Sequence, residues 1–599
     1  MSQPIDTMRH STAHVMAAAV KRLFPEAKFG VGPVVENGFY YDIDIGRAVT
    51  PEDVKAIDAE MKRIVKENPA FVREEMPIDE AVKRFKAMGQ TYKVELLSDL
   101  KKKGTTKISA EESTDVDPAN VKTVSVYQTG DFVDLCRGPH VEKAKEIGVW
   151  KLNKVAGAYW RGKQENPQMQ RIYGLCFATK DELANYETMM AEAEKRDHRK
   201  LGKELELFSI IDEVGPGLPL FYPKGAVLRR TLENFVTDMQ EKRGYAPIWI
   251  PHITKGRLYE MSGHLQKYDA MYPPMQLKDE DAYYLKPMNC PHFMMLYKTQ
   301  PHSYRELPVR WTCTTTNYRY EKSGELSGLT RVRSLTQDDC HVFAMPSQIE
   351  GEINLMLDMV DEAYRVFGFK DFWVRVSTHD PADKKKYIGD MKVWEASEAA
   401  LKRLIAGRGW KHEIGVGEAA FYGPKLDFMA KDVIGREWQL STVQLDMNLP
   451  ERFELEYVDA DGSKKRPVVI HRAILGSTER FLGILIEHYA GAFPVWLAPV
   501  QVIVLSVAER HADYAAKLVQ DLVDAGLRAE ADVSNESVGK KIRNAERMKV
   551  PYALVVGDKE AGGGDLTVRR RGEKDQSSMS KDAFLVRVSQ EDRERVTFQ

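Results

Sequence analysis

Two short segments decide how this sequence is interpreted: Lys286-Pro287-Met288-Asn289-Cys290-Pro291 and Thr336-Gln337-Asp338-Asp339-Cys340-His341. A third segment, His471-Arg472, adds a second imidazole. A thiolate and imidazoles are typical zinc ligands, and a catalytic zinc keeps three protein ligands and one open position. The Cys-x-x-Cys pairs typical of closed structural sites do not occur in this chain. The segments therefore predict an open metal site of Cys290, His341 and His471, although each residue alone would be read as an ordinary buried side chain.

Arginines recur around these segments, in Arg319-Tyr320-Glu321, in Arg331-Val332-Arg333 and in Gly476-Ser477-Thr478-Glu479-Arg480. A guanidinium group presents N–H donors in a fixed plane, which suits carboxylate and phosphate oxygens. One such arginine alone would indicate a surface salt bridge, whereas the ordered set indicates phosphate binding. Neither a Walker loop nor a Gly-x-Gly-x-x-Gly loop is evident, which disfavours a Rossmann-type nucleotide site.

By these strings the sequence resembles the threonyl-tRNA synthetase family, over nearly all of its 599 residues and most specifically between residues 286 and 343. The resemblance implies a multidomain α+β protein of the bacterial type, whose class II catalytic core is an antiparallel sheet with helices. It also implies ATP-dependent ligation of L-threonine to tRNA(Thr) through a threonyl-adenylate. ATP with Mg²⁺ and one Zn²⁺ per subunit are the expected cofactors, and a homodimer through the catalytic domain is expected.

The resemblance assigns further residues to the reacting groups. Arg319 is expected to hold the amino acid carboxylate and the α-phosphate, Glu321 the adenine amino group, and Arg331 the γ-phosphate. The other expected positions are Gln337, Asp339 and Tyr422 around threonine, and Lys425, Gln439, Ser477 and Arg480 around ATP.

Two positions depart from the family pattern. Leu335 stands where the family often has an aromatic residue, so adenine stacking from that position is not expected. His292-Phe293 follows Cys290-Pro291, where the family usually carries a His two or three residues after Cys-Pro. Packing beside the zinc is therefore expected to differ, without His292 replacing a ligand.

Coordination chemistry makes the predicted site selective in one direction only. Valine lacks the hydroxyl that the zinc and Asp339 are expected to bind. A site that binds a substrate hydroxyl discriminates against an analogue without it by a factor of ~10⁴ or more in kcat/KM, as is typical of synthetases. Serine keeps the hydroxyl and lacks one methyl group, which is worth only ~1–3 kcal/mol. Serine is therefore expected to be attached as well, and a second site should remove it.

Two pairs of residues spaced four apart are candidates for that second site, in His10-Ser-Thr-Ala-His14 and in Asp134-Leu-Cys136-Arg-Gly-Pro-His140. In an apolar-periodic run, spacing by four places both imidazoles on one helical face. The spacing alone fits a closed Cys-His₃ zinc site as well as metal-free chemistry. The resemblance implies a metal-free editing pocket that hydrolyses seryl-tRNA(Thr), made of His10, His14, Lys93, Asp134, Cys136 and His140.

The length of the chain predicts three or four domains. We expect an editing domain at 1–180, a linker helix at 181–207, a catalytic domain at 208–494 and an α/β domain at 495–599. In the last of these, strands alternate with helices, which predicts a parallel sheet. The resemblance implies that it reads the anticodon, while the pattern alone fits a generic ligand-binding or dimerisation module equally well.

Composition sets the remaining expectations. The net charge of −2 indicates that tRNA contacts come from local basic patches, and five scattered cysteines do not form a disulfide framework. The most apolar stretch, 493–508, contains 16 residues and two prolines, so no membrane contact is expected and the protein should be cytoplasmic. Nine residues precede His10, so the family's N-terminal ubiquitin-like domain is expected to be absent.

Two other classes of function remain to be weighed. A non-catalytic RNA-binding relative would have lost the metal ligands and the arginines, which this sequence keeps. A metal-dependent hydrolase centred on the first domain would fit the two pairs of residues spaced four apart, but it does not explain residues 286 to 480.

Overall fold

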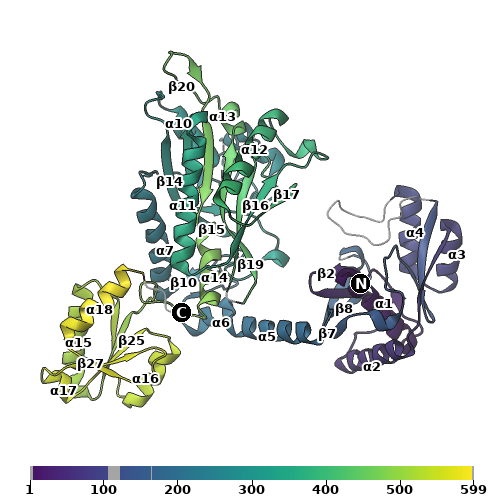
Figure 1. Ribbon diagram of the computed structural model, residues 1–599, viewed down its shortest axis with the longest axis horizontal. Helices are drawn as coiled ribbons and strands as arrows, with labels where there is room; N and C mark the ends of the chain where they lie inside the picture. The colour runs from purple at the N-terminus through teal and green to yellow at the C-terminus, as the bar shows by residue number, and fades with distance from the viewer. Residues whose placement is uncertain (1–3, 105–121, 163–164, 279, 433, 596–599) are drawn as a thin grey trace. The chain divides into compact units, whose positions relative to one another are not determined.

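The computed structural model describes residues 4–104, 122–162, 165–278, 280–432 and 434–595 (Figure 1). The chain divides into two compact units, Met1–Ala191 and Glu192–Gln599, and each has hydrophobic cores of its own. Within the described residues, no helix combines the length and the apolar character needed to cross a membrane.

Two antiparallel sheets form the first unit. The larger has the order β1 (Lys28–Phe29), β3 (Gly38–Asp44), β8 (Gln168–Phe177), β7 (Val149–Tyr159), with β2 (Val34–Val35) paired to β3. The smaller has the order β4 (Phe71–Pro77), β5 (Thr123–Thr129), β6 (Phe132–Leu135). The helices that pack on the larger sheet are α1 (Ile5–Leu23) and α2 (Pro51–Glu67). Those that pack on the smaller sheet are α3 (Ile78–Ala87) and α4 (Thr91–Lys103).

Helix α1 carries two of the predicted site residues, His10 and His14. It contains neither Gly nor Pro, and Asp6 in the first turn and Arg22 in the last complement the helix dipole. All side chains from residue 10 to residue 20 are buried, because the helix packs against the larger sheet and against α2. The helix therefore holds both imidazoles inside the unit, one turn apart.

An eight-stranded sheet forms the centre of the second unit. Its order is β11 (Ala246–Pro247), β14 (Val309–Tyr318), β15 (Ser334–Ala344), β22 (Val468–Ala473), β19 (Glu437–Asp446), β18 (Lys425–Lys431), β16 (Phe372–Thr378), β17 (His412–Val416). The pairs β11/β14 and β16/β17 are parallel and the other pairs are antiparallel. The predicted antiparallel class II core is thus confirmed.

Helices cover one face of this sheet and enclose the largest hydrophobic core. They are α7 (Pro223–Glu241), α11 (Ile349–Phe367), α12 (Met391–Arg408) and α14 (Thr478–His488). The opposite face carries α10 (Cys290–Lys298), together with the short helices α8 (Gly256–Ser262), α9 (His264–Lys267) and α13 (Asn448–Arg452). The same unit contains three two-stranded antiparallel sheets: β9 (Phe208–Ser209) with β10 (Leu220–Phe221), β12 (Ile253–Lys255) with β13 (Tyr283–Leu285), and β20 (Tyr457–Val458) with β21 (Lys464–Lys465).

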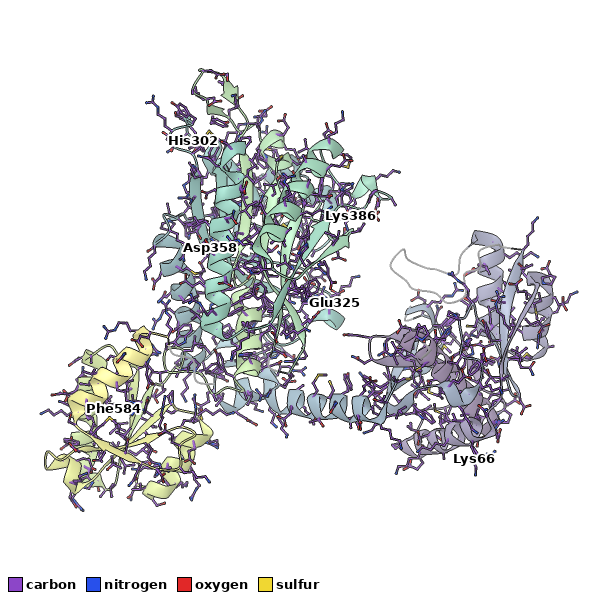
Figure 2. All side chains as sticks on the ribbon, in the orientation of Figure 1. Lys66, His302, Glu325, Asp358, Lys386 and Phe584 are labelled. Carbon is purple, nitrogen blue, oxygen red and sulfur yellow. The ribbon has the colours of Figure 1, made fainter. Side chains whose placement is uncertain are left out.

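The C-terminal sheet has the order β24 (Ala529–Asp532), β23 (Val502–Ser506), β25 (Tyr552–Val556), β26 (Leu566–Arg570), β27 (Ser577–Met579). Its helices are α15 (Ala512–Asp524), α16 (Val538–Arg547), α17 (Asp558–Ala561) and α18 (Lys581–Arg593), and Figure 2 marks Phe584 on α18. The expectation of a wholly parallel sheet was wrong, because β26 and β27 run antiparallel. The link from β25 to β26 is too short for a crossover, which needs about a dozen residues.

The predicted linker helix is interrupted. The structure has α5 (Lys180–Arg196) and α6 (His198–Glu204) where one helix was expected over 181–207. Asp197 between them leaves the helical conformation, and its side chain accepts a hydrogen bond from the backbone N–H of Arg199 as the N-cap of α6. An aspartate thus starts a new helix at a point where the apolar pattern alone predicts continuation.

Two glycines at the third position of equally long helices test the packing of the second unit. A Cβ at Gly225 in α7 would lie 1.9 Å from the carbonyl oxygen of Leu207, whereas one at Gly351 in α11 would meet nothing within 4 Å. We expect Gly225→Ala to lower the free energy of unfolding by about 1–3 kcal/mol. Gly351→Ala should leave it unchanged or raise it by up to about 1 kcal/mol. Urea unfolding of both variants measures the difference, and equal stabilities would contradict the packing described.

Candidate active sites

The eight-stranded sheet has two chemically different faces because side chains alternate along each strand. In β15, Val342 enters the helical core while Asp339 and His341 belong to the opposite face. In β22, Ile470 enters the same core while His471 belongs to the opposite face. The predicted ligand-binding residues therefore gather on the face that the long helices leave open.

The three predicted metal ligands meet on this face. Cys290 is the first residue of α10, and the register of β15 with β22 places His341 directly opposite His471. One ligand atom from each residue lies within 4.8 Å of the others, and the two imidazole centroids are 4.3 Å apart. All three side chains are buried. The structure thus brings together three residues from distant segments, as the sequence predicts.

Several buried nitrogens of this cluster lack hydrogen-bond partners. Among the described residues, neither ring nitrogen of His341 has a partner, and Nδ1 of His471 has none. Buried polar atoms are nearly always paired, so such atoms point to a ligand. His471 Nε2 lies 2.9 Å from Asp446 Oδ2, which leaves Nδ1 available, as in a metal-binding histidine supported by a carboxylate. The donor set fits a zinc ion.

The electrostatics of the cluster also favour a cation. Burial lowers the pKa of His341 and keeps this imidazole neutral, with a lone pair. Burial also acts to lower the pKa of His471, but Cys290 and Asp446 outweigh it and raise this pKa to about 10. A thiol and a carboxylate that stabilise positive charge on His471 would also stabilise a metal cation at the same place.

Asp339 is held by a chain of hydrogen bonds to which the sequence analysis assigned no role. Lys286 Nζ donates to Asn289 Oδ1 at 2.8 Å, and Asn289 Nδ2 donates to Asp339 Oδ2 at 2.9 Å. Lys286 also donates to Thr315 Oγ1 at 2.8 Å, and burial lowers its pKa to about 8. Both supporting residues stand in the segment 286–291, and only the fold shows which side chain they reach.

Tyr422 and Gln337 are the other residues predicted around threonine. The Tyr422 hydroxyl donates to Gln444 Oε1 at 2.7 Å, and its ring centroid lies 5.4 Å from that of His471. Gln337 Oε1 accepts from Asn317 Nδ2 at 2.8 Å, and Gln337 shares its strand face with Asp339. Tyr422 therefore borders the metal cluster directly, and Gln337 lies farther along the same strand.

Lys425 and Gln439, predicted on the ATP side, converge on a buried carboxylate. Lys425 Nζ lies 2.7 Å from Asp427 Oδ2, and Gln439 Nε2 donates to Asp427 Oδ1 at 2.7 Å. Arg375 donates to the same carboxylate at 3.2 Å. Sequence reasoning missed Asp427 and Arg375, because a single acidic or basic residue in a strand pattern carries no signal of its own.

Arg480 lies in the first turn of α14, which Ser477 caps by accepting the backbone N–H of Arg480 at 3.3 Å. Its guanidinium is largely buried and lies 5.9 Å from the ring centroid of Trp438, and its Nε has no partner within the described part of the chain. Burial and the nearby Arg331 lower the pKa of Arg480. Two guanidinium groups that repel each other leave a place suited to an anion.

The segment between β14 and β15 carries the remaining predicted residues. Arg331 lies 2.8 Å from Glu321 and 3.1 Å from Glu325, which Figure 2 labels. Arg319 Nε donates to the carbonyl oxygen of Pro287 at 3.4 Å. Arg319 thus reaches the segment of the predicted metal ligand Cys290, while Glu321 and Arg331 pair with each other.

The residues after Cys290 explain the expected difference in packing. Phe293 stacks on His341 with ring centroids 4.1 Å apart, so an aromatic ring supports this predicted metal ligand. His292 is buried, and burial together with Lys286 lowers its pKa to about 4. Neither of its ring nitrogens has a partner in the described residues.

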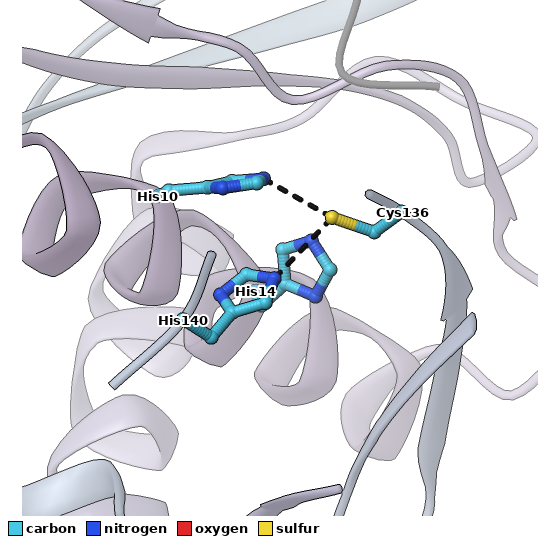
Figure 3. A group of neighbouring side chains, drawn as sticks. All are labelled: His10, His14, Cys136 and His140. Carbon is cyan, nitrogen blue, oxygen red and sulfur yellow. Dashed lines mark hydrogen bonds between the residues drawn. The ribbon is translucent and has the colours of Figure 1, made fainter. Parts of the chain in front are cut away.

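The first unit brings together the residues of the predicted second site (Figure 3). Cys136 Sγ lies 3.3 Å from His10 Nε2 and 3.3 Å from His140 Nε2. The ring of His14 lies 5.2 Å from that of His10 and 4.2 Å from that of His140. His10 and His14 come from α1, while Cys136 and His140 follow β6, so both predicted pairs contribute.

The other two predicted residues lie beside this cluster. Asp134 Oδ1 lies 2.5 Å from Lys93 Nζ, and Asp134 Oδ2 lies 3.6 Å from His14 Nε2. Tyr41, which sequence reasoning missed, donates its hydroxyl to Asp134 and lies 3.2 Å from Lys93 Nζ. The buried Lys93–Asp134 ion pair therefore orients the imidazole of His14 through the contact of Asp134 with Nε2.

The protonation state of this cluster suits acid–base chemistry, and a cavity beside it could hold a small substrate. Burial, followed by the neighbouring histidines, lowers the pKa of His14 and of His140, so both imidazoles are neutral near pH 7. A cavity of about 580 Å³ adjoins His10. It is lined by Asp6, Thr7, Arg9, His10, Val34, Val35, Glu36, Gly138 and Pro139.

The two clusters of Cys and His residues differ in how their atoms are paired. Both meet the spacing required for a metal, since the ligand atoms of His10, His14, Cys136 and His140 also lie within 4.8 Å of one another. Cys136 already contacts two imidazoles and the backbone N–H of Gly138, and His140 Nδ1 lies 3.1 Å from the hydroxyl of Ser11. Among the described residues, the cluster of Cys290 has three buried ring nitrogens without a hydrogen-bond partner, whereas the first cluster has one, Nδ1 of His14, and this difference favours a metal at the cluster of Cys290.

Three protein-family profiles match the chain. "tRNA synthetase class II core domain (G, H, P, S and T)" matches residues 275–489, and "Anticodon binding domain" matches residues 500–591. "Threonyl and Alanyl tRNA synthetase second additional domain" matches residues 124–173.

Curated proteins and solved structures give the same result. The chain is 49% identical to a threonine–tRNA ligase of Rubrobacter xylanophilus (97% of this chain, 88% of that protein) and 46% identical to one of Anoxybacillus flavithermus (99% and 89%). The RNA-binding domain of threonyl-tRNA synthetase from Cryptosporidium parvum matches with a TM-score of 0.63 and 37% identity (66% of this chain, 98% of that chain). A putative threonyl-tRNA synthetase from Aeropyrum pernix matches with a TM-score of 0.59 and 29% identity (67% and 96%). From its class II sheet, its second additional domain and these relatives, the chain belongs to the threonyl-tRNA synthetase family.

Proposed function

We propose that this protein joins L-threonine to tRNA(Thr) and hydrolyses seryl-tRNA(Thr) at a second site. The observation that carries the proposal is the cluster of Cys290, His341 and His471. Three buried ring nitrogens of this cluster have no hydrogen-bond partner among the described residues, and the cluster lies beside Asp339 and Tyr422. We assign editing to residues 1–180, a linker to 181–207, catalysis to 208–494 and anticodon binding to 495–599.

In the first half-reaction, a carboxylate oxygen of threonine attacks the α-phosphorus of ATP, and pyrophosphate leaves. Arg319 holds the carboxylate and the α-phosphate, because it reaches the segment of Cys290. Arg331 and Arg480 hold the γ-phosphate, because their mutual repulsion is relieved by an anion. ATP and Mg²⁺ are the cofactors that the family implies.

The nucleotide base and sugar lie on the side of Lys425, Gln439 and Ser477 in this proposal. Asp427 orients Lys425 and Gln439, so that its buried carboxylate acts through them rather than on ATP itself. Glu321 pairs with Arg331 in the structure and is free to turn to the adenine amino group once the phosphates engage this arginine.

Cys290, His341 and His471 would hold one zinc ion, which when bound supplies a Lewis-acidic position for the amino group and hydroxyl of threonine. Asp339, held by Lys286 through Asn289, accepts the hydrogen of that hydroxyl. Tyr422 and Gln337 close the pocket around the side chain. Valine leaves these polar groups unpaired and is refused, whereas serine satisfies them and is attached.

Serine is then removed in the first unit. We assign this step to His10, His14, Lys93, Asp134, Cys136 and His140, with no metal required. A water attacks the ester carbonyl, the ribose oxygen leaves, and neutral imidazoles organise the water and its proton. The Lys93–Asp134 pair fixes the orientation of His14.

The C-terminal α/β domain would bind the anticodon through basic side chains that the fold leaves exposed. Lys541 is buried and donates to the carbonyl oxygens of Ser506 and Asp532, so it supports the domain instead. Lys540, Arg543 and Arg547 on α16 are exposed and could contact phosphates, although Lys540 would first have to leave Glu536, to which it donates at 2.7 Å. We place the protein in the cytoplasm, where its substrates occur.

We also propose a homodimer formed through the catalytic domain. Seven of the exposed large apolar side chains fall between residues 210 and 253, and exposed apolar surface of this kind favours an interface. They are Ile210, Ile211, Val214, Leu220, Tyr222, Trp249 and Ile253.

Zinc analysis tests the proposed metal site. The wild-type protein should contain one zinc per chain, and Cys290→Ser should lose this zinc together with threonine-dependent ATP–pyrophosphate exchange, because the hydroxyl is a poorer ligand than a thiolate. Cys176→Ser, which alters a buried thiol of the first unit, should retain both. Zinc retained by Cys290→Ser would refute the assignment, and two zinc ions per wild-type chain would show that the editing cluster also holds metal.

Separation of the two activities tests the second site. We expect the double variant His10→Ala, His14→Ala to keep threonine-dependent exchange and to accumulate seryl-tRNA(Thr), because the water loses the groups that organise it. Lys83→Ala, at an exposed position of the same unit, should accumulate none. The acylation assay with serine decides, and absence of accumulation in the double variant would contradict the editing role.

A single charge tests the dimer. Trp249 is 78% exposed, and Trp249→Glu should convert the dimer to monomers in light scattering, because an interface core excludes an unpaired carboxylate. Val586→Glu changes an apolar side chain on α18 that is 67% exposed, and this variant should remain dimeric. A monomeric wild-type protein, or a dimeric Trp249→Glu variant, would count against the proposal.

A further inference from the structure

His198 is a buried histidine whose two ring nitrogens contact two different parts of the second unit. Its Nδ1 lies 2.6 Å from Glu487 Oε1, and its Nε2 lies 3.0 Å from the backbone nitrogen of Leu329. An amide N–H can only donate, so Nε2 must accept and Nδ1 must carry the proton that Glu487 accepts. These two bonds fix one neutral tautomer of the imidazole.

The two partners of His198 belong to the two elements that carry the proposed γ-phosphate ligands. Leu329 lies in the segment between β14 and β15, two residues before Arg331, and the backbone N–H groups of Thr330 and Arg331 donate to Ser327 in the same turn. Glu487 lies near the end of α14, whose first turn contains Arg480. One imidazole therefore ties the arginine of the segment to the arginine of the helix.

Both sides of this connection are held firmly. Glu487 also pairs with Arg436, which in turn lies 2.7 Å from Asp432, so the carboxylate cannot rotate away from His198. On the other side, Gly328 has a φ of +48°, and a Cβ there would lie 2.2 Å from His198 Nε2. The segment thus approaches the ring more closely than a residue with a side chain would permit.

The hydrogen bonds of His198 oppose the electrostatic repulsion between the guanidinium groups of Arg331 and Arg480. Burial and Arg331 both lower the pKa of Arg480, so the two guanidinium groups disfavour each other before an anion binds. Arg331 is half exposed, and its segment has only a short 3₁₀ helix, Ser323–Glu325, and a bridge from Arg331 to Ser327, so it could otherwise move toward solvent. Asp197, His198 and Glu487 also meet the spacing for a metal, but both nitrogens of His198 are already engaged.

We propose that His198 is a positioning residue for ATP, which holds the turn of Arg331 at the distance from Arg480 that the phosphates require. The proposal rests on the phosphate-binding roles proposed above for these two arginines. His198 touches neither substrate, and its effect passes through the backbone of Leu329. Its loss should therefore weaken ATP binding and leave threonine binding unchanged.

Two conservative variants separate the two bonds of the ring. In His198→Asn the side-chain amide can donate to Glu487 from the place of Nδ1, but it is too short to accept from Leu329. In His198→Gln the carbonyl oxygen can reach the place of Nε2. We expect the Asn variant to bind ATP about tenfold more weakly, the effect of one lost hydrogen bond, and the Gln variant to retain most of the affinity.

The measurements are ATP affinity by calorimetry, the KM values for ATP and threonine in pyrophosphate exchange, and amide hydrogen exchange. The Asn variant should show a raised ATP KM, an unchanged threonine KM, and faster exchange in peptides covering 319–333 but not in those covering α14. His302→Asn removes another buried imidazole of the unit, bonded to the carbonyl oxygen of Tyr297, and should change none of these.

A second variant approaches the same contact from the other side. Gly328→Ala leaves His198 in place but displaces the turn, and it should weaken ATP binding as the Asn variant does. Unchanged ATP affinity in both variants, or an equal rise of both KM values, would overturn the proposal. A wild-type protein that binds ATP without threonine-dependent exchange would instead refute the proposed function, while the ATP affinities would still decide the role of His198.

Discussion

The antiparallel pairing of β15 with β22 is the constraint on which the catalytic face depends. Its register places His341 opposite His471, and the alternation of side chains sends their neighbours Val342 and Ile470 into the helical core. A shift by one residue would exchange these two sets and bury both imidazoles among apolar side chains. The same hydrophobic burial that stabilises the sheet therefore fixes the geometry of the proposed metal site.

The two proposed active sites use the same residue types in different electrostatic settings. Around His471, a thiol and the Asp446 carboxylate favour positive charge, and unpaired nitrogens leave room for a cation. Around His14, Lys93 neutralises Asp134, and Cys136 is already bonded to two imidazoles. Neutral imidazoles suit both proton transfer and metal coordination, and the larger number of ring nitrogens without a hydrogen-bond partner around His471 favours coordination there. The proposed division between zinc chemistry at one cluster and hydrolysis at the other thus follows from the side chains around each cluster, because the Cys and His residues of the two clusters are of the same types.

Sequence patterns predicted both clusters of Cys and His residues, and the structure assembles each of them. They missed the residues that orient a predicted site residue by a hydrogen bond, such as Asp427, which binds Lys425, and Asn289, which donates to Asp339. A supporting residue has no motif, because its role depends on which distant side chain it meets. The break at Asp197 and the antiparallel β26 were missed for a local reason. One capping side chain starts a new helix at Asp197, and the link from β25 to β26, which contains only the short helix α17, cannot cross over to a parallel strand.

The sequence by itself determined which chemical groups are available, because thiol, imidazole and guanidinium side chains are recognisable by type and by short-range order. It also determined the alternation in each strand, and so the face on which every group stands. The tertiary structure alone decided which groups are paired and which remain unpaired, as His198 and His341 illustrate: one has both ring nitrogens engaged, the other neither. The physical reason is that hydrogen bonds between distant segments form only when packing brings them within about 3 Å, a distance that no spacing along the chain encodes.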